Sequence, residues 1–410
     1  MPIIPRNRYQ QWLDEFRDKK LVKVLTGLRR SGKSTILEIY IQHLIESGVP
    51  RERILCINFE KFEFEALTDP VRLHEMILET LTPGQMTYVF LDEIQHVRDF
   101  EKVIDSLYVR DAIDIYITGS TAELLSSEIA TRLTGRYVEI NVLPLSFLEY
   151  ASARGMAPGG EKRLFADYIT YGGMPGAMEF SNGSSAQREY MESVFKTIVE
   201  KDVLKRVKRG RFLVERIFRY LAATVGGLTS AKRLADRLAE DANYAKDGIP
   251  SYNTVVSYLE RLSDCFLFYK ADRFDVCGGE HLKQINKYYL TDFGFKYYLL
   301  QNPTLELQQL VENVVFFELK RRRCKVSTGK VDDKEVDFVI QGTDGRIRYV
   351  QVATSVADEQ KLAQELAAFS AIKDNHPKYL LTLDEIFVPD HGGIRTLNII
   401  DFLLERCDLD

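Results

Sequence analysis

Short apolar runs alternate with amphipathic segments along the first third of the chain. Residues 35–46 and 71–81 carry apolar side chains every three or four positions, which is typical of helices packed on one face. Five other runs are mostly apolar and have the length of buried strands: 21–25, 53–59, 87–91, 113–117 and 138–143. Strands that alternate with helices predict an α/β fold with a parallel sheet.

The first strand runs into a glycine-containing loop that resembles a phosphate-binding loop. Residues 27–34 read G-L-R-R-S-G-K-S and fit the pattern G-x-x-x-x-G-K-[ST] without a mismatch. Lys33 can reach the β- and γ-phosphates of a triphosphate, and the Ser34 hydroxyl can ligate Mg²⁺. The sequence therefore predicts ATP and Mg²⁺ as cofactors. The predicted nucleotide-binding residues are Gly27, Leu28, Arg29, Arg30, Ser31, Gly32, Lys33, Ser34, Thr35 and Asp92.

Two further predicted strands end in polar residues. Asp92 and Glu93 follow the apolar run 87–91, where Asp92 suits the Mg²⁺ shell and Glu93 suits polarisation of the attacking water. Ser120 follows the run 113–117 and is the predicted sensor of the γ-phosphate. Arg136, just before the strand 138–143, is the predicted arginine finger, acting on a neighbouring subunit or on its own nucleotide, and Arg132 is the reserve.

The motifs of the whole chain together resemble a large family of prokaryotic AAA-type ATPases. The carrying motifs are G-L-R-R-S-G-K-S, Y-V-F-L-D-E-I-Q, I-T-G-S, L-T-G-R, N-V-L-P-L-S-F-L-E-Y, Y-G-G-M-P, K-Y-Y-L-T-D-F-G, V-E-N-V-V-F-F-E-L and K-E-V-D-F-V-I. The resemblance implies an ATPase core that uses a catalytic glutamate, followed by a C-terminal domain of unknown function. Thr121 stands where this family often has asparagine, which leaves Ser120 as our choice of sensor.

The middle of the chain is expected to be mostly helical and to contain a winged helix. A basic run occupies residues 201–211, and it is either a solvated face or a phosphate contact. Three short helices between 212 and 262 and strands at 265–271 and 288–290 have the order of a winged helix. Its third helix would present the side chains that read DNA, or else the module would only pack against protein. These side chains are Tyr252, Asn253, Ser257 and Arg261.

The order of elements after residue 305 resembles the restriction-endonuclease-like fold. An active member of that fold needs a carboxylate on the first helix, an aspartate on a strand and an acid-x-lysine pair on the next strand. Glu312 and Asp337 match the first two positions, but Gln351 stands where the acid is expected and Ala353 where the lysine is. These residues predict a degenerate nuclease site. The candidate replacement lysines are Lys330, Lys334 and Lys361.

Length and charge set the remaining expectations. With 410 residues, the chain is long enough for several domains, which we expect at 1–148 (ATPase core), 149–210 (helical lid), 211–300 (winged helix) and 301–410 (nuclease-like). The formal net charge of −5 excludes a global attraction to nucleic acid, so DNA contact would need a local patch. Five scattered cysteines, and the lack of a long apolar run, predict a cytoplasmic protein that does not contact membrane.

Three functions are consistent with the sequence. The first is Mg²⁺-dependent ATP binding and slow hydrolysis that drive a conformational switch, acting on double-stranded DNA or on a protein partner, in a homo-oligomer. The second is an ATP-regulated nuclease in DNA repair or defence. The third is a non-enzymatic scaffold that nucleotide stabilises.

Overall fold

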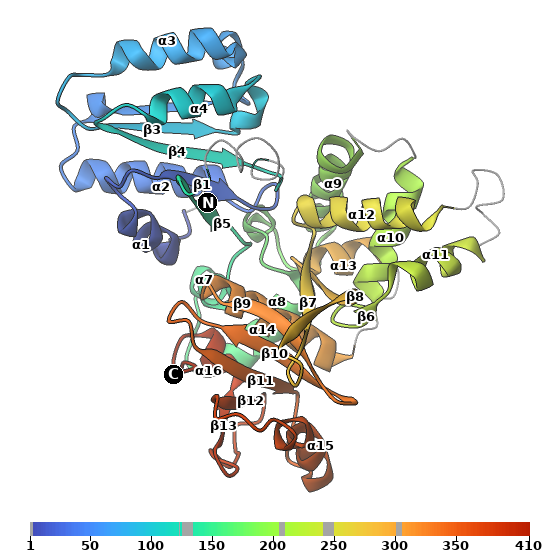
Figure 1. Ribbon diagram of the computed structural model, residues 1–410. Coiled ribbons are helices and arrows are strands. Elements are labelled where there is room, and N and C mark those ends of the chain that lie inside the picture. Colours follow the sequence, from blue (N-terminus) through green and yellow to red (C-terminus); the bar gives the residue numbers. More distant parts are fainter. Residues whose placement is uncertain (1–2, 123, 125–133, 205–209, 241–249, 301–305) are drawn as a thin grey trace. The chain divides into compact units, whose positions relative to one another are not determined.

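The computed structural model describes residues 3–122, 124, 134–204, 210–240, 250–300 and 306–410 (Figure 1). The chain divides into two compact units. The first unit comprises Met1–Pro144 with Asp264–Phe266, and the second comprises Leu145–Ser263 with Leu267–Asp410. The boundary at Pro144 lies near the predicted end of the ATPase core at residue 148.

The first unit is built on a five-stranded sheet in the order β2-β3-β4-β1-β5. All four strand pairings are parallel, so the carboxyl ends of the strands share one edge. This arrangement confirms the predicted parallel α/β sheet. The strands are β1 (Val22–Thr26), β2 (Ile54–Asn58), β3 (Thr87–Asp92), β4 (Ile113–Gly119) and β5 (Tyr137–Asn141).

Helices cover both faces of this sheet (Figure 1). On one face, α1 (Asn7–Glu15) and α2 (Lys33–Glu46) enclose an apolar cluster around the stacked rings of Phe90 and Tyr116. On the other face, α3 (Pro70–Thr80) and α4 (Phe100–Tyr108) enclose a second cluster. Both faces of the central strands are therefore dry, which explains their continuous apolar runs. Short 3₁₀ turns occupy Arg51–Arg53, Phe62–Thr68 and Ile94–His96.

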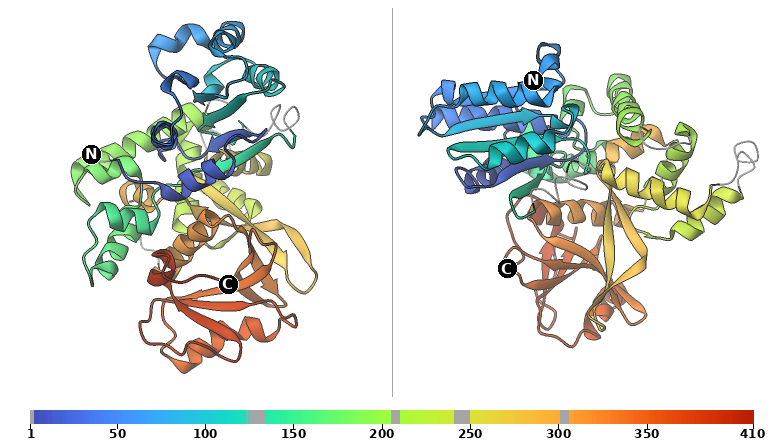
Figure 2. Two further views of the ribbon diagram at one scale, coloured as in Figure 1. Left: turned by 90° about the vertical axis from the view of Figure 1, so that its left-hand side faces the viewer. Right: turned by 45° about the horizontal axis from the view of Figure 1, so that its top comes forward.

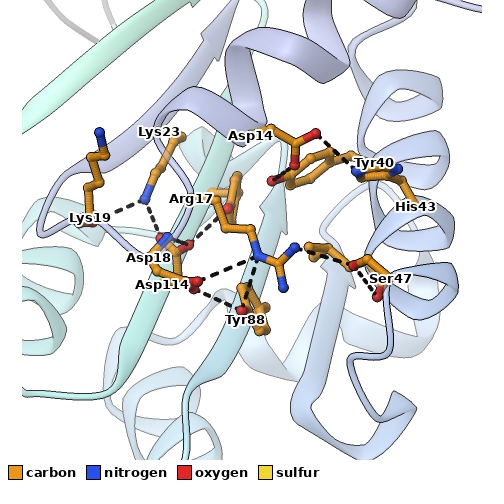
Figure 3. Close-up of polar contacts among 12 residues, drawn as sticks. Asp14, Arg17, Asp18, Lys19, Lys23, Tyr40, His43, Ser47, Tyr88 and Asp114 are labelled. Carbon is orange, nitrogen blue, oxygen red and sulfur yellow. Dashed lines mark hydrogen bonds and ion pairs between the residues drawn. The ribbon is translucent and has the colours of Figure 1, made fainter.

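A buried polar network joins the elements at the amino edge of this sheet, opposite the phosphate loop (Figure 3). The Lys23 ammonium of β1 pairs with the Asp114 carboxylate of β4, and both side chains are fully buried. Asp114 also accepts hydrogen bonds from the Tyr116 hydroxyl (2.8 Å) and from the backbone N–H of Asp18 (2.9 Å). The Tyr88 hydroxyl of β3 donates to Asp18 (2.8 Å), which extends the network across the edge. These contacts tie the segment after α1 to three strands.

The second unit contains a continuous eight-stranded sheet in the order β13-β12-β11-β10-β9-β7-β8-β6. The β7–β8 hairpin, at the position predicted for a wing, pairs in parallel with β9 of the C-terminal region. The segments expected at 211–300 and 301–410 therefore share one sheet. The strands are β6 (Leu228–Thr229), β7 (Phe268–Asp275), β8 (Glu280–Leu290), β9 (Lys325–Val331), β10 (Lys334–Gln341), β11 (Ile347–Ala353), β12 (Lys378–Thr382) and β13 (Ile394–Asn398).

Several helices of the second unit begin at a side chain that caps them. Ser146 and Glu149 form a reciprocal capping box at the start of α7, and Ser230 caps α11 as its place before the helix suggests. Helix α14 contacts strands β9, β10 and β11, and α15 contacts β10 and β11 (orange to red in Figure 2). The helices are α7 (Phe147–Ala153), α8 (Glu161–Tyr171), α9 (Ser185–Ile198), α10 (Arg211–Ala223), α11 (Ala231–Ala239), α12 (Tyr252–Asp264), α13 (Phe293–Leu299), α14 (Leu307–Arg321), α15 (Glu359–Ser370) and α16 (Ile399–Leu403), with short turns at Pro175–Glu179 and Val199–Val203.

Within the described ranges, none of the helices combines the length and apolar character that a membrane span requires.

Candidate nucleotide-binding site

The phosphate loop connects β1 to α2 and depends on two glycines with positive φ. Gly27 has φ 140°, and a Cβ atom built on it would lie 2.2 Å from the carbonyl oxygen of Val142. Gly32 has φ 101° and directly precedes the first turn of α2. Side chains at these positions would strain the loop, so glycine is required by its shape. The loop therefore directs backbone N–H groups and the positive end of α2 towards a bound anion.

Lys33 places its ammonium within the loop. The Nζ atom donates to the carbonyl oxygens of Gly27 (3.0 Å) and Leu28 (3.3 Å), and it lies 3.7 Å from Oε1 of Glu93. Lys33 is buried, so its charge is only weakly screened. The sheet thus brings together the predicted phosphate-binding lysine and the predicted catalytic glutamate.

Asp92, at the end of β3, is held by neighbours on both sides. The Thr118 hydroxyl of β4 donates to Oδ1 (2.6 Å), and the Asn58 amide of β2 donates to Oδ2 (2.6 Å). Burial raises the pKa of Asp92, while hydrogen bonds from Thr118 and Ser34 oppose that rise. The Ser34 hydroxyl and the oriented Asp92 carboxylate are hard oxygen donors, so the residues present fit Mg²⁺.

Glu93 is a buried carboxylate with an unusual backbone conformation. Its φ of 56° turns the chain sharply after β3, and its N–H donates to the Thr118 hydroxyl (2.8 Å). Burial alone would raise the pKa of Glu93, but Lys33, a hydrogen bond from Gln95, and Arg29 outweigh it and hold the pKa below its usual value. An ionised carboxylate at this edge can accept a proton from water.

Ser120 follows β4 and is buried beside Arg29 of the phosphate loop. The Arg29 Nη2 atom donates to the Ser120 hydroxyl (3.3 Å), and Nη1 lies 3.1 Å from Oε1 of Glu60. Single carboxylate or imidazole atoms of Glu60, Glu93 and His96 lie within 4.8 Å of one another. These three side chains lie at the same edge of the sheet as Asp92. Their proximity alone does not identify a metal site.

Arg136 lies at the opposite edge of the sheet from the phosphate loop. It directly precedes β5, and its carbonyl oxygen accepts from the N–H of Val22 at the start of β1. Its guanidinium donates to Asp105 (3.0 Å) and lies over the Tyr108 ring. This position does not suit action on the nucleotide of the same chain, and action on a neighbouring subunit stays a prediction. The reserve, Arg132, is outside the described residues.

Sequence reasoning missed three side chains that position the site. Arg6 is buried and donates to the carbonyl oxygens of Ser31 (3.2 Å) and Leu143 (2.8 Å), which braces the phosphate loop against the chain after β5. Asn58 and Thr118 orient Asp92 as described above. Thr118 had a detectable signal, since polar ends of parallel strands meet at one edge, whereas no local pattern marks Arg6.

In the second unit, the predicted nuclease-like residues surround a lysine that the sequence did not indicate. Lys287 of β8 lies 3.0 Å from Oε1 of Glu312, 2.8 Å from Oε1 of Glu335 and 3.9 Å from Oδ1 of Asp337. Burial would lower the pKa of Lys287, but the three carboxylates outweigh it and raise the pKa. Burial, and then the nearby Glu312, raise the pKa of Asp337.

The remaining predicted members contact the edge of this cluster or lie apart from it. Gln351 accepts from the backbone N–H of Asp337 (3.2 Å) and donates to Glu365 (2.8 Å). Among the candidate lysines, Lys334 donates to the carbonyl of Ala367, Lys361 donates to Thr354, and Lys330 of β9 is half-buried. Lys287 lies on β8, which precedes α14 in the chain. The acid-x-lysine pair is expected on a strand after that helix, so the pattern could not indicate Lys287.

The predicted DNA face is partly described. Tyr252 and Asn253, at the start of α12, are exposed, whereas Ser257 and Arg261 are half-buried. Of the basic run at 201–211, Lys201 is exposed, and residues 205–209 lie outside the described residues. Arg211 pairs with Glu215 (2.6 Å), which reduces its local positive charge.

Comparisons with known proteins place these features in a family. Residues 19–151 match a family described as an AAA domain, and residues 162–306 match a domain of unknown function (DUF8612). An uncharacterized protein of Haemophilus influenzae is 34% identical over 408 residues, which cover 98% of this chain and 99% of the relative. An uncharacterized protein of Methanocaldococcus jannaschii is 27% identical over 381 residues, which cover 86% of this chain and 79% of the relative.

A solved structure is similar in fold over most of this chain. The Walker-type ATPase of Pyrococcus abyssi aligns with a TM-score of 0.50 and 18% identity, over 72% of this chain and 96% of the other. At this identity the likeness concerns the fold alone. Together with the parallel sheet and the match to an AAA domain, it supports a P-loop ATPase fold. The chain therefore belongs to the family of its Haemophilus influenzae relative, and its residues 19–151 match an AAA domain.

Proposed function

We propose that this protein binds ATP with Mg²⁺, hydrolyses it slowly, and uses the cycle to switch conformation while acting on DNA or on a protein partner. The observation that carries the proposal is the convergence of Lys33, Asp92, Glu93 and Ser120 on the carboxyl edge of one parallel sheet. These residues come from the ends of two strands, β3 and β4, and from the loop after β1, and their chemistry is that of phosphoryl transfer.

Each side chain has a role in the proposed reaction. The Lys33 ammonium and the N–H groups of the loop bind the phosphates, and Ser34 with Asp92 would hold Mg²⁺, which offsets phosphate charge when bound. Glu93 accepts a proton from water as the water oxygen bonds to the γ-phosphorus. The bond from that phosphorus to the bridging oxygen breaks, and ADP leaves with the electron pair. Ser120 orients the water or senses the γ-phosphate.

Two variants test the assignment of these roles. Lys33→Ala should lose ATP affinity, because its buried ammonium lies within the loop that would bind the phosphates. Glu93→Gln should bind ATP and fail to turn it over, because an amide accepts no proton at neutral pH. Equilibrium binding of a fluorescent ATP analogue and steady-state phosphate release measure the two properties. Undiminished turnover by Glu93→Gln would remove Glu93 from the role of base.

The choice between DNA and protein as the partner depends on the second unit. Exposed Tyr252 and Asn253 are suited to a base or phosphate contact, but the formal net charge of −5 gives no general attraction to DNA. Steady-state hydrolysis with and without double-stranded DNA tests this. Stimulation that Asn253→Ala reduces would support DNA as the partner, whereas turnover indifferent to DNA would favour a protein.

A nuclease is the second candidate, favoured by the presence of Lys287 beside Glu312 and Asp337. Against it, the Lys287 ammonium is buried and already paired with carboxylates. The test is incubation of the full chain with Mn²⁺ or Mg²⁺ and mixed DNA forms. Cleavage that disappears in Asp337→Ala would establish this activity. Nucleotide that co-purifies and never turns over would instead support the scaffold.

A further inference from the structure

The Arg29 side chain crosses the carboxyl edge of the first unit's sheet. Arg29 belongs to the loop after β1, yet its two terminal nitrogens contact Ser120, which follows β4, and Glu60, which follows β2. In the strand order β2-β3-β4-β1, strand β3 lies between β2 and β4. The guanidinium therefore spans the end of β3, where Glu93 stands.

Distances and charge agree with this placement. The Glu60 carboxylate, which Arg29 contacts, has an oxygen within 4.8 Å of an oxygen of Glu93. Arg29 is also among the positive groups that keep the Glu93 carboxylate ionised. The side chain of Arg29 is only 11% exposed, so its charge acts in a partly desolvated setting.

Its neighbours define what this guanidinium can reach. Lys33, Glu93 and Ser120 are the residues to which the proposed function assigns the γ-phosphate and the attacking water. A guanidinium among them can donate two parallel hydrogen bonds to phosphate oxygens, which a lysine cannot do. Its partner Glu60 is 43% exposed, and an ion pair of that exposure contributes little, so a triphosphate can replace it.

We propose that Arg29 is a catalytic arginine finger supplied by the chain's own phosphate loop. It contacts Glu60 when no nucleotide is present and donates to the γ-phosphate oxygens as the bond to ADP breaks. Arg29 transfers no proton. It stabilises the charge that develops on the oxygens between bond breaking and attack by water. This inference rests on the proposed ATPase function and gives Arg29, which the sequence predicts only as a nucleotide-binding residue, a catalytic role in that reaction.

The test compares Arg29→Ala with Arg72→Ala in the full chain. Arg72 lies on α3, outside the candidate site, and is exposed, so its variant controls for the loss of an arginine charge from the first unit. Arg29→Ala should keep ATP affinity and lower kcat by about 10³-fold, which is the low end for arginine fingers. Arg29→Lys should recover only part of the loss, because the planar fork is missing. Arg72→Ala should turn over ATP like the unchanged protein.

The Glu60→Gln variant distinguishes a catalytic role of Arg29 from a purely structural role of its contact with Glu60. If the Arg29 contact with Glu60 only holds the loop in place, removing either partner should lower kcat equally. The proposal instead expects Glu60→Gln to change kcat by less than about fivefold. Equal losses in Glu60→Gln and Arg29→Ala, or in Arg72→Ala and Arg29→Ala, would overturn it. So would a kcat for Arg29→Ala within about fivefold of the unchanged protein.

Two further measurements can be interpreted even if the variants differ in how well they fold. ADP with aluminium fluoride mimics the phosphoryl group in transfer, and Arg29→Ala should bind ADP but fail to trap the fluoride. Mixing Arg29→Ala with Glu93→Gln tests whether the arginine acts within its own chain. Restored turnover in the mixture would mean action on a neighbour and would refute the proposal. If the unchanged protein neither binds nor hydrolyses ATP, the proposed function itself fails. If only Glu93→Gln loses turnover, the arginine assignment alone fails.

Discussion

Replacing Lys287 by methionine should strongly destabilise the second unit. Lys287 on β8 lies 2.8 to 3.9 Å from the carboxylates of Glu312, Glu335 and Asp337, which belong to α14 and β10. Methionine keeps most of the side-chain volume and removes the charge. The variant therefore leaves several acidic groups close together in a buried place with no cation among them.

The size of the effect follows from the distances. Coulomb's law at an effective dielectric constant of about 20 gives roughly 5 kcal/mol for unit charges 3 Å apart. The cost of removing the ammonium from water offsets part of that attraction, and breaking a buried pair typically costs about 3–5 kcal/mol. We expect a loss of about 3–5 kcal/mol in the free energy of unfolding at pH 7.

Urea denaturation of the full chain, followed by circular dichroism, measures this loss. Lys270→Met on the neighbouring strand β7 is the matched control, because Lys270 pairs with Asp272 at 2.8 Å but both side chains are about half exposed. That variant should lose less than about 1 kcal/mol. Adding Glu312→Gln to Lys287→Met should recover part of the loss, since it removes one of the unpaired carboxylates.

The pH dependence provides an independent check. Burial and the nearby Glu312 raise the pKa of Asp337 above its usual value, and removing the Lys287 ammonium takes away the main charge that opposes this rise. Groups with such a raised pKa contribute stability that is present at low pH and is lost as the pH rises. The deficit of Lys287→Met should therefore shrink when the pH is lowered from 7 towards 5. A loss below about 1 kcal/mol at pH 7, or a loss that does not shrink on acidification, would refute this reasoning.

Three further substitutions test other parts of the structure. Gly27→Ala should abolish ATP binding, measured by equilibrium titration, because its Cβ would meet the Val142 carbonyl at 2.2 Å; unchanged affinity would contradict the loop geometry. Asp114→Asn should lower the midpoint of thermal unfolding by leaving the buried Lys23 ammonium without its anion, and an unaltered midpoint would argue against that pair. Burial lowers the pKa of Lys296 to about 8, so Lys296→Met should be more stable at pH 7 by up to roughly 3 kcal/mol. That advantage should disappear between pH 8 and 10.5 as the unfolded lysine loses its proton, and a constant advantage would contradict the shifted pKa.

The ATPase core was largely predictable because its signals are local. The phosphate loop is a continuous stretch, and its glycines, Lys33 and Ser34 follow one another in a fixed order. The run of apolar residues before Asp92 and Glu93 predicts a strand that delivers both carboxylates to the sheet edge. Parallel strands alternating with helices then place the polar strand ends together without knowledge of any distant contact.

Tertiary structure alone decided which distant side chains meet. Arg29 contacts Glu60 and Ser120, 31 and 91 positions away, because the strand order brings their loops to one edge. The direction of the strands also separates Arg136 from that edge. Arg136 precedes the parallel strand β5, so it lies at the amino edge of the sheet.

The sequence by itself determined the elements, the phosphate loop and the acidic end of β3, because these depend on periodicity and on neighbouring residues. It did not determine that Lys287 lies among the carboxylates of the second unit, or that β7 continues the C-terminal sheet. Strand order and pairing depend on packing between segments far apart in the chain, and such packing leaves no pattern in either segment alone.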